Sequence, residues 1–376
     1  MRQISKDQLK VRYSTRPPEG QPNDVRLAEH LELGISEVFK LGDAIQADLD
    51  PKVMGIGWWT SYTGLGQKER IYISDHLVGA ARAVSGNVLE GVAERLELGS
   101  AIEDFRYYLS RGIKNGEVVA PPPRGPADDI SPLRTTAAIC GVLRALASAL
   151  DCLGTCVVGV AGLSTSIVRA DLATTRKHLD KAATRNPRLS QLAADLTAAI
   201  AAAGPSGWMT WLIAMRNTDV HRARRIMNFN VVRGAGNAIE GINLNLPKSP
   251  ELTEIQAYVY AGGVAASHFE APAEEFLDHL MDSTHAFLNA AARLLEELWR
   301  ERQLDHTLVE QPASQWVDSP ALVSSTPAFG GYPDIAASDT ALRAIATSDE
   351  MRERLEAAGM TLRATGDLKP APQVWH

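Results

Sequence analysis

An arginine, an amide and a histidine lie within six residues of one another in the segment WLIAMRNTDVHRARR, residues 211–225. The apolar first half of this segment predicts a helix, on which Asn217 and His221 share a face because they stand four residues apart. Arg216 lies about 100° from Asn217 around such a helix, and its long side chain can still reach toward the imidazole. The segment therefore predicts a cluster of one guanidinium, one amide and one imidazole.

These residue types suit chemistry on a phosphodiester. Histidine titrates near neutral pH and can accept or release a proton, and the arginine fork can hold phosphate oxygens. RNA carries its own nucleophile, the 2′-hydroxyl, so such a cluster could cleave RNA without a metal ion. Neighbouring arginines favour the neutral imidazole that a general base requires. One histidine is too few to act as both base and acid, which suggests that two chains contribute to one site.

More basic residues follow the cluster. Arg222, Arg224, Arg225 and Arg233 are expected to bind RNA, and Asp219 is the acid among them. The chain as a whole has 45 acidic and 38 basic residues and a net charge of −7, so its overall field does not attract nucleic acid. Binding of a polyanion would therefore depend on this local group of cations.

The hexapeptide RNTDVH, residues 216–221, resembles the Arg-polar-x-x-x-His signature of HEPN-domain proteins, in its Arg-Asn form. Those proteins are α-helical bundles, and many are metal-independent endoribonucleases of prokaryotic toxin–antitoxin, abortive-infection and CRISPR systems. The resemblance implies that Arg216, Asn217 and His221 are catalytic and that a homodimer brings two such trios together. It also implies RNA as the substrate, and leaves room for an antitoxin or another regulatory protein as a partner. It covers the motif and the general helical layout of residues 71–305.

Two other interpretations of the segment remain open. The last turn of a helix can carry Arg and His simply because cations stabilise the negative end of the helix dipole. A HEPN-like domain can also serve as a non-catalytic dimerisation module that binds RNA or a protein. A symmetric cleft between two chains, lined by Arg216 and His221, would favour the enzyme. Burial of His221 against the following hairpin would favour the binding module.

Other groups with chemical potential have simpler explanations. Glu275 and His279 stand four residues apart, as metal ligands in helical bundles do, but apolar residues compete for the inward face. A solvent-exposed acidic face is therefore expected there. Cys152 and Cys156 also stand four residues apart, without a second pair at zinc-finger spacing, so buried thiols are expected. We expect neither a metal ion nor another cofactor.

Helical periodicity dominates the chain and predicts an all-α, HEPN-like bundle that positions the motif. Ser131 with Pro132, and Ser206, are expected to begin the most apolar helix and the motif helix. The segments IMNFNVVR and INLNLP alternate in the strand period and predict a small β-hairpin insertion after the motif helix. The other predicted helices span residues 23–49, 74–98, 100–113, 131–168, 187–203, 272–303 and 339–359.

We expect three regions: an N-terminal extension (1–70), a HEPN-like helical domain (71–305) and a C-terminal tail with one helix (306–376). Three cysteines are too few for a disulfide framework, and the N-terminus shows no secretory signal. The segment 152–168 is uncharged but short and poor in large aliphatic residues, so a buried core helix is expected rather than a membrane span. These features predict a cytoplasmic protein with no membrane partner.

Overall fold

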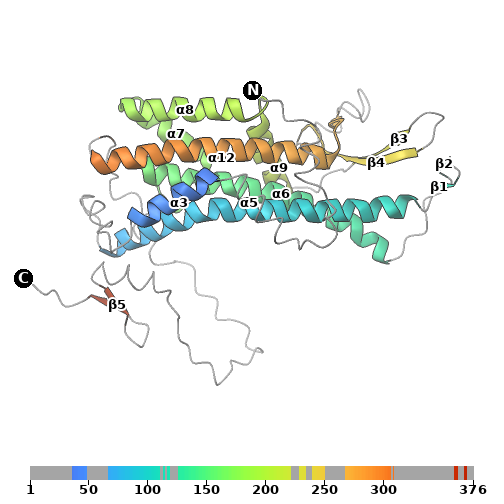
Figure 1. The fold of residues 1–376 in the computed structure, drawn as a ribbon, viewed down its shortest axis with the longest axis horizontal. Coiled ribbons are helices and arrows are strands. Elements are labelled where there is room, and N and C mark those ends of the chain that lie inside the picture. The colour runs from blue at the N-terminus through green and yellow to red at the C-terminus, as the bar shows by residue number, and fades with distance from the viewer. Residues whose placement is uncertain are drawn as a thin grey trace, which may run out of the picture. The chain divides into compact units, whose positions relative to one another are not determined.

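The computed structural model describes residues 36–48, 67–110, 113–114, 117–118, 126–221, 228–233, 239–249, 267–305, 308, 360–362 and 368–370. Most of this part of the chain is helical, which confirms the all-α class. The helices are α3 (Ser36–Asp48), α5 (Gln67–Ser110), α6 (Pro126–Ala161), α7 (Leu172–Ala183), α8 (Pro187–Ala203), α9 (Trp208–His221) and α12 (Ala273–Leu304) (Figure 1).

Three antiparallel pairs of short strands accompany the helices in the described residues. The pair β3 (Asn228–Arg233) and β4 (Ile239–Asn245) is the predicted hairpin after the motif helix, so that prediction is confirmed. Two smaller pairs were not predicted, because strands of two or three residues are too short to show alternation. They are β1 (Ile113–Lys114) with β2 (Glu117–Val118), and β5 (Met360–Leu362) with β6 (Leu368–Pro370).

The most apolar helix, α6, differs at both ends from its predicted span. It begins at Pro126, so the predicted N-cap at Ser131 is wrong and Pro132 lies inside the helix. Pro126 suits the first helical position because that position needs no backbone N–H donor. The helix ends at Ala161, before Gly162, whose φ of 60° is the left-handed conformation that commonly ends a helix.

Helix α7 was not predicted from the sequence. Asp171 caps its start by accepting a hydrogen bond from the backbone N–H of Thr174 at 2.6 Å. Its buried residues are Leu172, Thr175 and Leu179, which follow the helical period. Only two of the three are large and apolar, so the helix shows a weak sequence pattern although its inner face is well buried.

The chain divides into two compact units, and five of the described helices (α3, α5, α6, α8 and α12) contribute residues to both. Unit 1 comprises residues 1–38, 83–151 and 194–292, and it contains α9. A buried ion pair ties α5 to α12 in this unit: Arg95 donates from Nε and Nη2 to the two carboxylate oxygens of Asp278, at 2.7 and 3.0 Å. Burial raises the pKa of Asp278 to about 6, although the charge of Arg95 acts in the opposite direction.

Unit 2 comprises residues 39–82, 152–193 and 293–376. Among the described residues of this unit, the least exposed cation is Arg302, which is 2% exposed and donates from Nη1 to the carbonyl oxygens of Gly159 and Val160, at 2.9 and 2.8 Å. These carbonyls lie in the last turn of α6, where a helix supplies no backbone donor. Arg302 therefore caps α6 from α12, and burial lowers the pKa of Arg302 to about 9.

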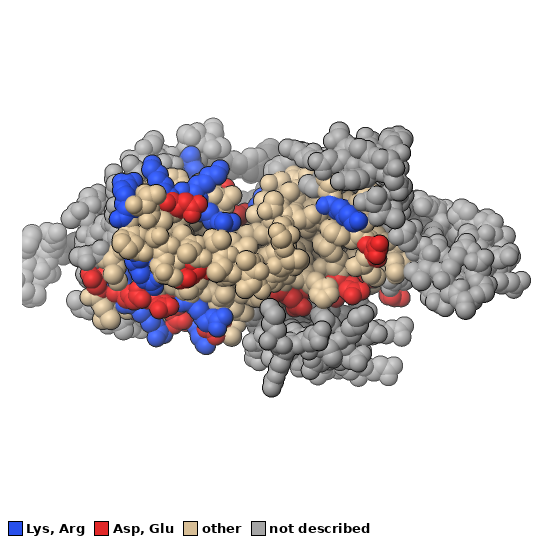
Figure 2. Space-filling model, turned by 90° about the horizontal axis from the view of Figure 1, so that it is seen from above, with Lys and Arg blue, Asp and Glu red and all other residues tan. Residues whose placement is uncertain are grey.

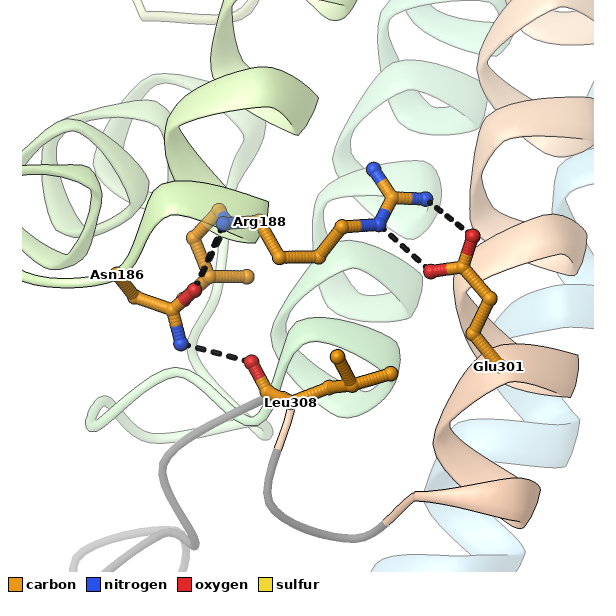
Figure 3. A network of polar contacts seen from close by, with 5 residues as sticks. Asn186, Arg188, Glu301 and Leu308 are labelled. Atoms are coloured by element: carbon orange, nitrogen blue, oxygen red, sulfur yellow. Dashed lines mark hydrogen bonds and ion pairs between the residues drawn. The ribbon is translucent and has the colours of Figure 1, made fainter.

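A polar network holds the α7–α8 turn against α12 within unit 2 (Figure 3). Oδ1 of Asn186 accepts hydrogen bonds from the backbone N–H groups of Arg188 and Leu189, which caps α8. The side-chain amide of Asn186 donates to the carbonyl of Leu308 at 2.8 Å. Arg188 forms a two-pronged ion pair with Glu301, at 2.6 and 3.2 Å, so its charge is matched.

Gly154 lies where α6 meets the start of α7, and it gives a test of this contact. A Cβ atom at this position would lie 2.9 Å from the backbone nitrogen of Leu172 and 3.0 Å from the backbone carbon of Asp171. Backbone atoms cannot move aside cheaply, so we expect Gly154→Ala to lower the free energy of unfolding by about 1–3 kcal/mol in urea titrations.

Gly86 in α5 is the matched control for Gly154. A Cβ atom at Gly86 meets nothing within 4 Å, so Gly86→Ala should raise the free energy of unfolding by about 0.5–1 kcal/mol through helix propensity alone. If both variants were stabilised, the close contact between α6 and α7 would be contradicted.

One described helical segment, Pro132–Ala161, is long and apolar enough to cross a membrane by length and composition. In its most apolar window, 67% of the residues are buried inside the protein. The segments Pro187–Ala203 and Trp208–Thr218 would meet the same criterion only together, and they are bent by 83°. A buried core helix satisfies this length and composition criterion as readily as a membrane span does.

Candidate functional site

Helix α9 carries the predicted motif and buries one face in unit 1. The residues on this face are Trp208, Met209, Leu212, Met215 and Thr218, each at most 8% exposed. Their spacing of three and four residues follows the helical period and leaves the opposite face of α9 outside the core. The motif thus lies at the C-terminal end of a helix whose apolar side is fixed.

Two tryptophans anchor the first half of α9. The indole nitrogen of Trp208 donates to the carbonyl of Ile200 at 3.1 Å, across the break that separates α8 from α9. The indole nitrogen of Trp211 donates to the carbonyl of Pro247 at 3.3 Å, and its ring packs edge-on against Phe269. The predicted cap at Ser206 is wrong, because Gly207, with φ of 85°, precedes the first helical residue.

The β3–β4 hairpin is tied to the segment that leads into α12. The side-chain amide of Asn245, at the end of β4, donates to the carbonyl oxygens of Phe269, Glu270 and Ala271 at 3.0–3.1 Å. Pro247 and His268 form an isolated antiparallel bridge beside it. Because Trp211 also bonds Pro247, the helix and the hairpin that flank the motif share one support.

Arg216 forms an ion pair inside the same unit. Its Nη2 atom donates to Oδ2 of Asp151, in α6, at 2.6 Å, and the two side chains are 23% and 31% exposed. The Nε atom of Arg216 is buried and has no hydrogen-bond partner among the described residues. The guanidinium is therefore held at the edge of the core, with donor capacity left over.

Asn217 lies on the exposed side of α9, opposite Leu212. The helix extends through His221, so the backbone places position 221 one turn beyond Asn217 on that same side. The helical spacing predicted for this pair is confirmed. The structure brings Arg216 and Asn217 to adjacent parts of the α9 surface, and His221 follows them on the last turn.

The predicted RNA-binding arginines are described only in part. Arg222, Arg224 and Arg225 lie outside the described residues. Arg233 is the last residue of β3, where its backbone pairs with Ile239 of β4 at the point where the strand register shifts. Their role in RNA binding stays a prediction.

The described residues outside α9 contain no group of three or more His, Cys, Asp or Glu side chains that could hold a metal ion. Glu275 and His279 are exposed on α12, whereas His285 is buried, so these side chains do not face one point. Cys156 is fully buried, and burial raises the pKa of its thiol. The expectation of a buried thiol is confirmed for Cys156, while Cys152 is only half-buried.

Asp151 is the functional candidate that sequence reasoning missed. It stands 65 residues before Arg216 and appeared in the sequence only as the charge that borders an apolar segment. Comparisons of the chain with protein-family models, with curated proteins and with solved structures found no match. The functional interpretation therefore depends on the residue types at the end of α9 and on their local geometry.

The ion pair gives a testable consequence for RNA binding. If Arg216 holds phosphate, the carboxylate of Asp151 competes for the same guanidinium and repels the phosphate. We expect Asp151→Asn to tighten RNA binding about two- to fivefold, measured by fluorescence anisotropy in a His221→Ala background that spares the RNA. Unchanged or weaker binding would assign Arg216 a structural role in unit 1.

Proposed function

We propose that this protein is a metal-independent endoribonuclease of the HEPN type, with Arg216, Asn217 and His221 as its catalytic residues. The observation that carries the proposal is that α9 runs through His221, so its backbone brings position 221 one turn beyond the exposed Asn217. Arg216 lies beside them with a buried Nε atom that has no partner in the described part of the chain. This is a set of groups suited to a phosphodiester.

The proposed reaction uses the substrate's own 2′-hydroxyl as the nucleophile. His221 takes the proton from that hydroxyl, and the 2′-oxygen attacks the adjacent phosphorus. The bond from phosphorus to the 5′-oxygen breaks, and a proton donor protonates the leaving oxygen. The products are a 2′,3′-cyclic phosphate end and a 5′-hydroxyl end. No oxidant, reductant or metal ion enters this balance.

Arg216 and Asn217 have distinct parts in the proposal. The guanidinium of Arg216 stabilises the charge that develops on the phosphate oxygens. The exposed amide of Asn217 orients either the imidazole or the phosphate, for which it has both donors and an acceptor. The arginines that follow the motif, Arg222, Arg224 and Arg225, with Arg233, bind the RNA backbone outside the scissile position.

A homodimer follows from the single motif histidine in each chain. One imidazole accepts the proton from the 2′-hydroxyl, and the imidazole of a second chain donates to the leaving oxygen. We place this dimer in the cytoplasm of a prokaryote, in antiphage defence or as a toxin. An antitoxin or another regulatory protein would hold the activity in check.

A non-catalytic HEPN-like module that binds RNA or a protein is the alternative. The ion pair between Arg216 and Asp151 favours this alternative, because the carboxylate competes with a phosphate for the guanidinium and weakens phosphate binding. In that case the end of α9 serves dimerisation or partner binding, and the chain cleaves nothing.

Incubation of the purified protein with cellular RNA, with EDTA or with added Mg²⁺, separates the two functions. The proposal predicts equal fragmentation in both conditions, followed on denaturing gels. Fragmentation that requires Mg²⁺ would contradict the metal-free reaction. Absence of fragmentation by a dimer that still binds RNA would support the binding module instead.

A further inference from the structure

Four exposed cations gather on α7 and the turn that follows it, in unit 2. We call them the α7 cation group: Arg176, Lys177, Lys181 and Arg185. Figure 2, which looks onto the molecule from above, shows Lys and Arg side chains gathered toward one end of the described surface, with Asp and Glu side chains beside them. Within the described chain, none of the four forms an ion pair.

This lack of partners sets the group apart from many other arginines. Arg188, only three residues beyond Arg185, is held by Glu301. Carboxylates also pair with Arg95, Arg134, Arg144, Arg216 and Arg300. The chain has 45 acidic residues and 38 basic ones, so a shortage of carboxylates does not explain why these four cations form no ion pair.

Like charges on one helix face have an energetic cost. Lys177 and Lys181 stand four residues apart, where two cations destabilise a helix by a few tenths of a kcal/mol. Of the two acids in and before α7, Asp171 is used as the N-cap and Asp180 is exposed. The group therefore carries four positive charges against two exposed acids, Asp171 and Asp180, and an anionic partner would relieve the remaining repulsion.

The helix beneath these cations is rigidly supported. Leu172, Thr175 and Leu179 bury its inner face, and Asn186 fixes the turn that follows. The group runs from Arg176, in α7, to Arg185, in the turn after it, and nine steps of about 1.5 Å give it a length of roughly 13 Å along the helix direction. Such a row of charges on a fixed element suits an extended polyanion.

We infer that the α7 cation group binds the phosphate backbone of single-stranded RNA and does not contact the bases. The choice of RNA rests on the proposed function. A membrane surface is disfavoured because its binding helices place large apolar residues beside the cations, whereas Ala173 is the apolar residue on the exposed side of α7. An acidic protein would be the other source of negative charge, and the test includes it.

The salt dependence of RNA binding tests the inference. The affinity of a 5′-fluorescein 20-nucleotide RNA is measured by anisotropy in EDTA from 50 to 200 mM salt, with every protein in a His221→Ala background. Four phosphate contacts on a single strand give a log–log salt slope of about −2.8. Replacing all four cations of the α7 cation group by Gln should reduce the slope by about that amount and weaken binding more than about tenfold at 0.1 M salt.

The control variant changes four exposed cations elsewhere: Lys40→Gln, Lys248→Gln, Arg293→Gln and Arg300→Gln. Both variants have a net charge of −7 − 4 = −11, so a general field effect changes them equally. Circular dichroism establishes that each is folded. The single variants Lys177→Gln and Lys181→Gln, with an expected slope change of about 0.7 each, keep the test valid if the fourfold variant does not fold.

Equal effects in the two fourfold variants, or no effect in either, would overturn the inference. Displacement of the RNA by polyglutamate as effectively as by unlabelled RNA would overturn it too, in favour of an acidic protein partner. Cleavage is scored separately on the chain with His221 intact. Cleavage without binding through α7 contradicts the inference alone, and binding through α7 without cleavage contradicts the proposed function alone.

Discussion

His221→Ala should reduce the rate of RNA cleavage in EDTA by about a hundredfold or more, because a positioned general base typically contributes that much. The variant should still bind RNA, since the guanidinium of Arg216 and the α7 cation group remain in place. The measurement is the initial rate of cleavage of a fluorescent RNA, together with its affinity by anisotropy.

His279→Ala is the matched control for this loss. His279 is exposed on α12 and lies outside the proposed site, so its removal should change the rate less than about twofold. The unfolding temperatures of both variants should stay close to that of the parent. Equal rates for the His221→Ala variant and the parent would remove His221 from the mechanism and leave the end of α9 as a cationic helix terminus.

Arg302→Met should cause the largest loss of stability, by about 2–4 kcal/mol in urea titrations. The variant removes the donor to two carbonyls at the end of α6, and both carbonyls lie among fully buried residues such as Val160. A buried carbonyl without a donor costs about 1–3 kcal/mol. The substitution also removes the cost of burying a cation, which offsets part of that loss of stability. Burial disfavours the charged guanidinium and so lowers the pKa of Arg302.

Arg300→Met is the control for Arg302. Arg300 stands two residues earlier on α12, with a side chain that is 70% exposed and paired with Glu296 one turn away. Pairs of that kind contribute less than about 0.5 kcal/mol. A stable Arg302→Met variant would show that the buried guanidinium costs as much as its two hydrogen bonds contribute.

The elements that carry the motif could be predicted from the sequence because their patterns are local. The segment before Arg216 is apolar, and the spacing of Asn217 and His221 follows the helix that the structure contains. The alternation on either side of residues 234–238 predicted the β3–β4 hairpin. The predicted helix at 339–359 and the start of the one at 23–49 lie outside the described residues, and the region borders at 70 and 305 stay predictions.

What the sequence did not predict depends on tertiary structure or on weak local patterns. The pairing of Arg216 with Asp151 joins α9 to α6 and has no local signature. Helix α7 buries Leu172 and Leu179 with only a threonine between them, so its apolar pattern is faint. At α6, the Ser131–Pro132 pair resembles a helix start, yet the helix runs through it from Pro126.

The chemical groups at the new RNA ends distinguish attack by the 2′-hydroxyl from attack by water. RNA cleaved by the protein in EDTA is analysed for the groups at each new terminus. We expect 2′,3′-cyclic phosphate and 5′-hydroxyl ends, formed by the parent and lost with His221→Ala. Ends with 3′-hydroxyl and 5′-phosphate groups would contradict the proposed reaction, because they require water or another external nucleophile in place of the 2′-hydroxyl.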